Sequence, residues 1–146
     1  MIGLLAGKGI TAEFHGDKSL SKRPMKRIIE PLSQMGVKIE SENGYLPIKI
    51  FPSFLQGITY LSATPSAQVK SSIIFAAFGA NGETVVKEHT KSRDHTEIML
   101  KSLGVQLNKE EKISIKPLLK PLNSFELTVP GDPSSAAFFA AAAAMI

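Results

Sequence analysis

Apolar residues recur every three or four positions in the stretch that follows Pro24. The members of this periodic set are Met25, Ile28, Ile29, Leu32 and Met35. That spacing places the five side chains on one face of a helix. Pro24 suits the first turn of such a helix, Gly36 suits its C-terminal cap, and the interior Pro31 is expected to kink it. The sequence therefore predicts an amphipathic helix over residues 24–35.

Similar patterns predict the remaining elements. Further helices are expected over Ser66–Phe78 and Asp94–Leu103, and a last one from about Ser134. Short runs rich in β-branched and aromatic residues predict strands between them. These predicted strands are Thr11–His15, Val37–Glu40, Leu46–Ile50, Gly57–Leu61, Thr84–Lys87, Val105–Leu107, Lys112–Ile115 and Phe125–Val129. The pair Asn43-Gly44 predicts a tight turn, and the cluster Pro130-Gly131-Asp132-Pro133 breaks the chain before the last helix.

Two parts of the chain share one pattern at a fixed spacing. The segment Leu32-Ser33-Gln34-Met35-Gly36-Val37 matches Leu100-Lys101-Ser102-Leu103-Gly104-Val105 at an offset of 68 residues. The same offset carries Ser66 onto Ser134, and both serines start helices rich in small residues. A recurring period of this kind indicates repeated structural units. The unit reads β-α-β-β-β-α, or βαβαββ in circular order, so we predict an α/β (α+β) fold with about two copies of it.

Composition narrows the possible functions. The 146 residues are 43% hydrophobic and include no cysteine, which allows a core but excludes disulfides, thiolate metal sites and a cysteine nucleophile. The net charge of +4 suits small anionic ligands and is modest for a nucleic-acid binder. The longest apolar run, Ala136–Ile146, is too short to span a membrane. We expect a cytoplasmic location and neither nucleic-acid nor membrane partners.

Both ends of the chain are apolar and lack capping residues. Ile2, Leu4 and Leu5 lie at the start, and the run Ala136–Ile146 has no polar face. An all-apolar helix must be covered by other structure. We therefore expect an excerpt from a longer protein, in which the remainder of the same polypeptide is a partner of this chain.

Three helix starts carry residues that suit anions. Arg23 directly precedes the first predicted helix, Ser66-Ala67-Gln68 opens the second, and Ser92-Arg93 precedes the third. Free N–H groups and the positive end of the helix dipole attract anions, and arginine adds a planar fork that fits carboxylate or phosphate. Because these starts recur within a repeated unit, they can lie on one face and form a single site for a polyanion.

Each start also has an ordinary structural explanation. Ser21 can cap a solvated basic loop, Ser66 can be a simple N-cap, and Asp94 with Glu97 fits a capping box. A metal site built from Asp94, His95 and Glu97 is disfavoured because neighbouring positions on a helix point in different directions. The sequence shows no candidate base with an evident partner and no known nucleotide-binding or hydrolase motif.

Three motifs, in this order, resemble the 5-enolpyruvylshikimate-3-phosphate synthase family. They are Gly16–Met25 (GDKSLSKRPM), Ser66–Ser71 (SAQVKS) and Ser92–Glu97 (SRDHTE), and Val129–Phe139 is similar to the same family. The resemblance implies two domains, each of three βαβαββ units arranged as an inside-out α/β barrel, with the substrates between them. Residues 1–130 then form part of the first domain, and residues 131–146 form the crossover and first helix of a mostly absent second domain.

The activity implied by this resemblance is transfer of the enolpyruvyl (carboxyvinyl) group from phosphoenolpyruvate to the 5-hydroxyl of shikimate 3-phosphate. Phosphate leaves, and neither metal nor organic cofactor is involved. The resemblance assigns Arg23 and Gln68 to phosphoenolpyruvate, and Ser66, Ala67 (through its backbone), Gln68, Ser92 and Arg93 to shikimate 3-phosphate. The acid–base residues of the family lie outside this chain, so we expect no catalytic residue in it and only weak substrate binding by it alone.

Two other functions stay open at this point. UDP-N-acetylglucosamine enolpyruvyl transferases share the fold and the donor, but they carry a reactive cysteine in the loop before their Arg-Pro, where this chain has Lys18. That difference favours shikimate 3-phosphate as the acceptor. The second alternative is a non-catalytic anion-binding domain, which is favoured if the native product ends at Ile146.

Overall fold

The computed structural model describes residues 1–109 and 112–145, which form a mixed α/β structure with two sheets. The N-terminal half contains α1 (Ile2–Gly7), β1 (Ala12–Phe14), the 3-10 turn η1 (Leu20–Lys22), α2 (Lys26–Gln34), β2 (Lys38–Glu42), β3 (Tyr45–Phe51) and β4 (Thr59–Ser62). It is followed by α3 (Ala67–Ala77), β5 (Thr84–Glu88), α4 (His95–Ser102), β6 (Leu107–Lys109), β7 (Ile113–Ile115) and α5 (Pro133–Met145).

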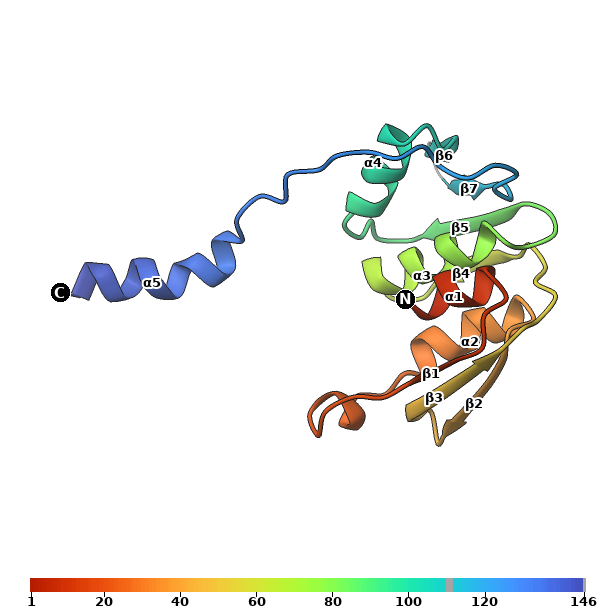
Figure 1. Ribbon diagram of the computed structural model, residues 1–146, viewed down its shortest axis with the longest axis horizontal. Helices are drawn as coiled ribbons and strands as arrows, with labels where there is room; N and C mark the ends of the chain where they lie inside the picture. The colour runs from red at the N-terminus through yellow and green to blue at the C-terminus, as the bar shows by residue number, and fades with distance from the viewer. Residues whose placement is uncertain (110–111, 146) are drawn as a thin grey trace.

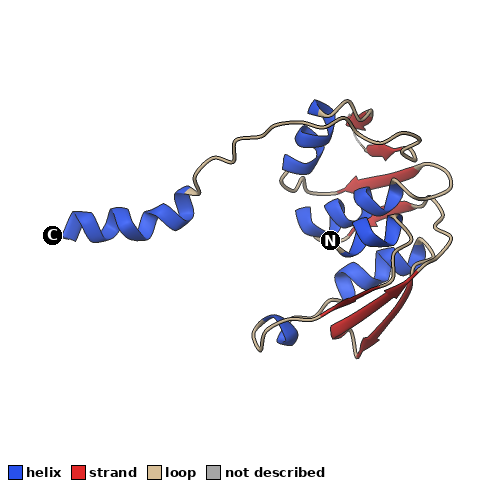
Figure 2. Cartoon of the chain, in the orientation of Figure 1, coloured by secondary structure: helices blue, strands red, loops and turns tan. Residues whose placement is uncertain are grey.

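The two sheets lie on the outside, with helices α1, α2 and α3 between them (Figure 2). The first sheet has the order β1-β3-β2 and is antiparallel throughout. The second has the order β4-β5-β7-β6, in which only β4 and β5 are parallel. Helix α3 is the crossover between these two parallel strands, so it runs through the centre of the molecule.

The order of the elements confirms the predicted repeat. The segment β4-α3-β5-α4-β6-β7 is one complete βαβαββ unit. The preceding α1-β1-α2-β2-β3 follows the same order without the first strand, and its sheet order β1-β3-β2 matches β5-β7-β6. The chain therefore holds one full unit, most of a second, and in α5 the helix that would belong to a third.

The sequence repeat corresponds to one recurring helix ending. Gly36 and Gly104 both adopt positive φ, at 96° and 83°. In each copy, the residue after the glycine donates its N–H to the carbonyl oxygen of a buried leucine four positions before the glycine. Val37 donates to Leu32 and Val105 donates to Leu100, both at 3.0 Å. Glycine tolerates this left-handed conformation at little cost, and the bond satisfies a helix-end carbonyl. The offset of 68 residues thus marks a capping motif together with its core leucine.

Helices α1 and α3 touch through their backbones. A Cβ added to Gly3 would lie 1.9 Å from the carbonyl oxygen of Ser72, and one added to Gly79 would lie 1.7 Å from that of Gly7. Only glycine allows such an approach. This contact fixes α1 against the central helix, and the surrounding core includes Leu32, Met35, Ile48, Ile50, Ile73, Ile74 and Ile115, which are fully buried.

The structure differs from the sequence predictions at four places. Residues 125–129, predicted as a strand, have no regular structure, so that prediction is wrong. The strand predicted over 105–107 lies instead at Leu107–Lys109. Helix α2 starts at Lys26, two residues after Pro24, and includes Pro31. Helix α1 was not predicted, because its six residues show too little periodicity.

Helix α5 extends away from the rest of the molecule (Figure 1). Its described residues are exposed along its length, with Phe138 and Phe139 among them. Within residues 1–109 and 112–145, no helix is both long and apolar enough to cross a membrane.

Candidate functional site

The first turns of α2, α3 and α4 lie side by side on one side of the molecule, at the left edge of the body in Figure 1. Arg27 Nη2 in α2 donates to Gln68 Oε1 in α3 at 3.2 Å. One turn farther along α3, Ser71 Oγ and Thr96 Oγ1 of α4 share a hydrogen bond of 2.7 Å. The structure thus brings together the three helix starts that the sequence singled out.

The loop that carries Arg23 is shaped by its own backbone contacts. Asp17 Oδ1 accepts from the N–H groups of Ser19 and Leu20, and Met25 N donates to Gly44 O at 2.8 Å. Ser21 Oγ donates back to Gly16 O at 3.1 Å and does not cap α2. The side chain of Arg23 is exposed, three residues before α2 begins at Lys26, which leaves its guanidinium accessible to an anionic ligand.

Ser66 caps α3, as its structural explanation predicts. Its Oγ accepts from Val69 N at 3.4 Å, so the hydroxyl proton is still available to a ligand. The N–H groups of Ala67 and Gln68 belong to the first turn, where a helix provides no acceptor. Capping and anion binding by Ser66 are therefore compatible, because the cap uses a lone pair and an anion would take the proton.

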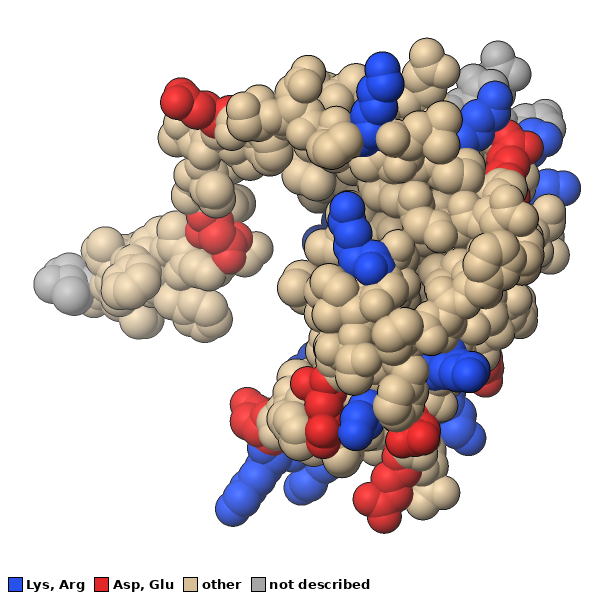
Figure 3. All heavy atoms as spheres, turned by 45° about the vertical axis from the view of Figure 1, so that its right-hand side comes forward, with Lys and Arg blue, Asp and Glu red and all other residues tan. Residues whose placement is uncertain are grey.

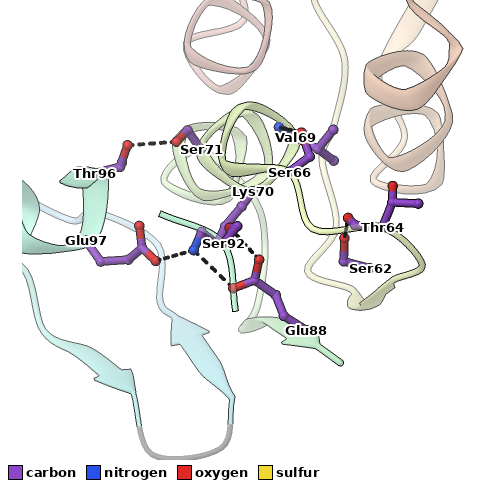
Figure 4. Close-up of polar contacts among 10 residues, drawn as sticks. All are labelled: Ser62, Thr64, Ser66, Val69, Lys70, Ser71, Glu88, Ser92, Thr96 and Glu97. Atoms are coloured by element: carbon purple, nitrogen blue, oxygen red, sulfur yellow. Dashed lines mark hydrogen bonds and ion pairs between the residues drawn. The ribbon is translucent and has the colours of Figure 1, made fainter. Parts of the chain in front are cut away.

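A buried ion network lies behind the starts of α3 and α4 (Figure 4). Lys70 of α3, only 3% exposed, places Nζ 3.0 Å from Glu88 Oε2 and 2.8 Å from Glu97 Oε1. Burial alone lowers the pKa of Lys70, but the hydrogen bonds and charges of Glu97 and Glu88 outweigh it. The pKa of Lys70 therefore lies above its ordinary value of 10.5, and the lysine is charged at neutral pH.

Ser92 is held by the same network. Its Oγ donates to Glu88 Oε1 at 2.6 Å, across the loop that joins β5 to α4. Arg93 follows it, exposed, two residues before α4 begins at His95. The expected capping box does not form, because the carboxylate of Glu97 is directed at Lys70. Arg27, Lys70 and Glu88 were not among the predicted site residues. The only signal for the buried lysine is its place between Val69 and Ile73 on the inward face of α3.

The other surface features contain none of the predicted site residues and indicate no alternative site for an anion or a metal. An apolar cavity of about 400 Å³ lies at the far end of α3, beside Phe75, Phe78 and Leu122, and contains none of the predicted site residues. No cluster of three or more candidate metal ligands occurs among the described residues. Figure 3 shows basic and acidic side chains interspersed over one face of the molecule, without a single basic stripe.

Comparison with known proteins gives a consistent result. The family model described as EPSP synthase (3-phosphoshikimate 1-carboxyvinyltransferase) matches residues 1–146. A 3-phosphoshikimate 1-carboxyvinyltransferase of Bacillus subtilis (strain 168) is 46% identical over 149 residues, which cover 100% of this chain and 35% of that protein. The protein of the same name from Thermodesulfovibrio yellowstonii is 48% identical over 147 residues, covering 99% of this chain and 34% of that one.

A solved structure agrees in fold as well as in sequence. The EPSP synthase from Acinetobacter baumannii superposes with a TM-score of 0.81 at 43% identity, over 94% of this chain and 32% of that one. The chain thus spans about a third of the length of the curated relatives that it matches.

Proposed function

Because this chain belongs to the EPSP synthase family, we propose that the protein in which it occurs transfers the enolpyruvyl group of phosphoenolpyruvate to the 5-hydroxyl of shikimate 3-phosphate. Residues 1–130 would form part of the first domain, and residues 131–146 would lead into the second. The substrates are small anions, the further partner is the rest of the same polypeptide, and the location is the cytoplasm.

One observation supports this proposal above the others: the starts of α2, α3 and α4 converge through the Arg27–Gln68 and Ser71–Thr96 contacts. Such an arrangement turns several N–H groups and the positive ends of three helix dipoles toward one place, which suits a ligand with phosphate and carboxylate groups. In this proposal, the N–H groups of α3, together with Ser66, Ser92 and Arg93, bind shikimate 3-phosphate.

Arg23 and Gln68 would bind phosphoenolpyruvate on the α2 side of this surface. Arg27 donates to Gln68 Oε1 and so sets the direction of the amide, which leaves the amide N–H groups of Gln68 for the ligand. The chain contributes charge and hydrogen bonds, which stabilise negative charge in a transition state. We assign it no acid–base residue, because the described site residues include no candidate base aimed at the ligand surface.

A segment exchange tests this function. The matching 35% of the Bacillus subtilis relative is replaced by residues 1–146, and phosphate release is measured with both substrates. We expect turnover by the chimera and none by the 146-residue chain alone.

Arg23→Ala in the chimera removes charge-assisted hydrogen bonds to phosphoenolpyruvate, so kcat/KM for that substrate should fall roughly 10- to 100-fold.

The control is Lys38→Ala, which removes an exposed cation from β2 and should leave kcat/KM unchanged. A folded chimera that lacks turnover, or an Arg23→Ala chimera that matches the unsubstituted one, contradicts the proposed function. Turnover by the 146-residue chain alone would overturn the assignment of no catalytic residue.

A further inference from the structure

The ion network of Lys70, Glu88 and Glu97 has a position that a purely structural role does not explain. It joins three elements, α3, the end of β5, and α4, directly behind the candidate site (Figure 4). Buried ion pairs are weak sources of stability, since desolvation offsets most of the attraction. Well-packed apolar side chains would hold these three elements together at least as well. The network is therefore better explained by what it orients.

Glu88 is the member of the network that reaches the site. One carboxylate oxygen, Oε2, pairs with Lys70 Nζ at 3.0 Å, and the other, Oε1, accepts from Ser92 Oγ at 2.6 Å. Lys70 and Glu88 have side chains that are only 3% and 9% exposed, so neither has room to change its rotamer freely. Lys70 and Glu88 thereby fix the position of the Ser92 hydroxyl relative to α3.

Ser92 lies in a loop that no helix or strand of its own orders. Residues 89–94, between β5 and α4, form no helix or strand. Ordering a free backbone residue has an entropic cost that a ligand would otherwise have to meet on binding. A contact that orders the loop beforehand lowers this cost and raises affinity without touching the ligand.

We propose that Lys70 and Glu88 are positioning residues that hold the Ser92–Arg93 loop against the start of α3, so that both sides of the shikimate 3-phosphate site are ordered before the substrate binds. The part that concerns the substrate rests on the proposed function. Lys70 fixes Glu88, Glu88 fixes Ser92, and Arg93 follows Ser92 along the chain. Neither Lys70 nor Glu88 contacts the substrate in this arrangement.

The fold offers a matched control at the other end of the same strand. Glu83, directly before β5, accepts a hydrogen bond from Ser114 Oγ, just as Glu88 at the end of β5 accepts one from Ser92. Glu83→Ala thus removes a serine-binding carboxylate from the same strand without affecting the site. Glu88→Gln is the conservative variant. Its single amide oxygen can still accept from Ser92, but its NH2 group then faces Lys70 Nζ, so the link to Lys70 is lost and Lys70 keeps only Glu97 as its partner.

The experiment has two parts. In the 146-residue chain, NMR relaxation and amide hydrogen exchange report the order of residues 89–94. We expect Glu88→Ala to disorder them and Glu83→Ala to leave them ordered. Glu88→Gln should give intermediate order, because the contact with Ser92 remains and the contact with Lys70 is lost. In the chimera with the Bacillus subtilis relative, Glu88→Ala should raise KM for shikimate 3-phosphate about tenfold with kcat within about twofold, since the loss is one of ordering before binding. Glu88→Gln should restore KM to within about threefold.

The two parts separate the possible failures. An ordered 89–94 loop in a folded Glu88→Ala chain overturns the positioning role, whatever the chimera does. A disordered loop with an unchanged KM also overturns it, because the order would then not serve the substrate. If the unsubstituted chimera has no turnover, the proposed function and the substrate part of this inference fail together. The relaxation data then decide whether Glu88 orders the loop.

Discussion

Lys70→Met should lower the free energy of unfolding of the chain by about 3–5 kcal/mol, the cost of leaving buried charges without their partner. Lys70 is the cation within 3.0 Å of both Glu88 and Glu97, and its side chain is 3% exposed. Oε2 of Glu97 has no hydrogen-bond partner within residues 1–109 and 112–145, so removal of the lysine leaves this carboxylate with even less compensation. Urea denaturation followed by circular dichroism measures the loss.

The double variant Lys70→Met with Glu97→Met is the control for this effect. It removes Lys70 together with Glu97, the more deeply buried of its two anionic partners, and so should recover more than about 1 kcal/mol of the loss, although Glu88 still lacks its cation. The raised pKa of Lys70 adds a pH test. Stability from its charged form is complete below about pH 10.5 and is lost as pH rises through the higher folded-state value. A Lys70→Met chain as stable as the unsubstituted one, or a Lys70 titration midpoint at or below 10.5, would contradict the ion network.

Gly3→Ala should also destabilise the chain strongly, although alanine is the better helix former. In an open helix the substitution would gain roughly 0.5–1 kcal/mol. Here the new methyl group would lie 1.9 Å from the backbone carbonyl oxygen of Ser72, which cannot move without shifting α3. Overpacking typically costs about 1–3 kcal/mol and sometimes more, so the clash outweighs the gain in helix propensity. Thermal unfolding of the variant measures the difference.

Gly131→Ala is the matched control, because a Cβ at Gly131 would meet nothing within 4 Å. It should leave the unfolding temperature unchanged. If the Gly3→Ala chain has the same unfolding temperature as the Gly131→Ala chain, the result contradicts the close backbone contact between α1 and α3.

The sequence was most informative where local chemistry decides the structure. The caps at Gly36 and Gly104 require a residue that tolerates positive φ, and each follows a periodic apolar face whose leucine is buried. These features predicted both helix ends and the repeat that relates them. The turn at Asn43-Gly44, where both residues have positive φ, was predictable for the same reason.

The prediction failed where structure depends on a partner distant in sequence. Residues 125–129 correspond in the repeat to β4, which is a strand because it pairs with β5, the strand that follows α3. Within residues 1–109 and 112–145, no strand pairs with residues 125–129. A strand-like composition does not form a strand without a neighbour to pair with.

In the candidate site, too, local features were predictable from the sequence and contacts between distant residues were not. The three helix starts were evident from Arg23, Ser66 and Ser92, because capping and anion-binding residues have a local signature. The ion network behind these helix starts was not evident from the sequence, since Lys70 and Glu88 lie 18 positions apart and meet only in the folded chain. A lone lysine on an apolar helix face is the one hint of such a partner, because burial of its charge requires a counter-ion.

In the proposed function, the starts of α2, α3 and α4 form one wall of a shikimate 3-phosphate site. A titration of the 15N-labelled chain with shikimate 3-phosphate tests it most directly. We predict that the amides of Ala67, Gln68 and Arg93 shift together and saturate along one binding curve, while those around the apolar cavity at Phe78 do not move. Saturable shifts confined to that cavity, or no shift at Ala67, Gln68 and Arg93, would contradict the claim.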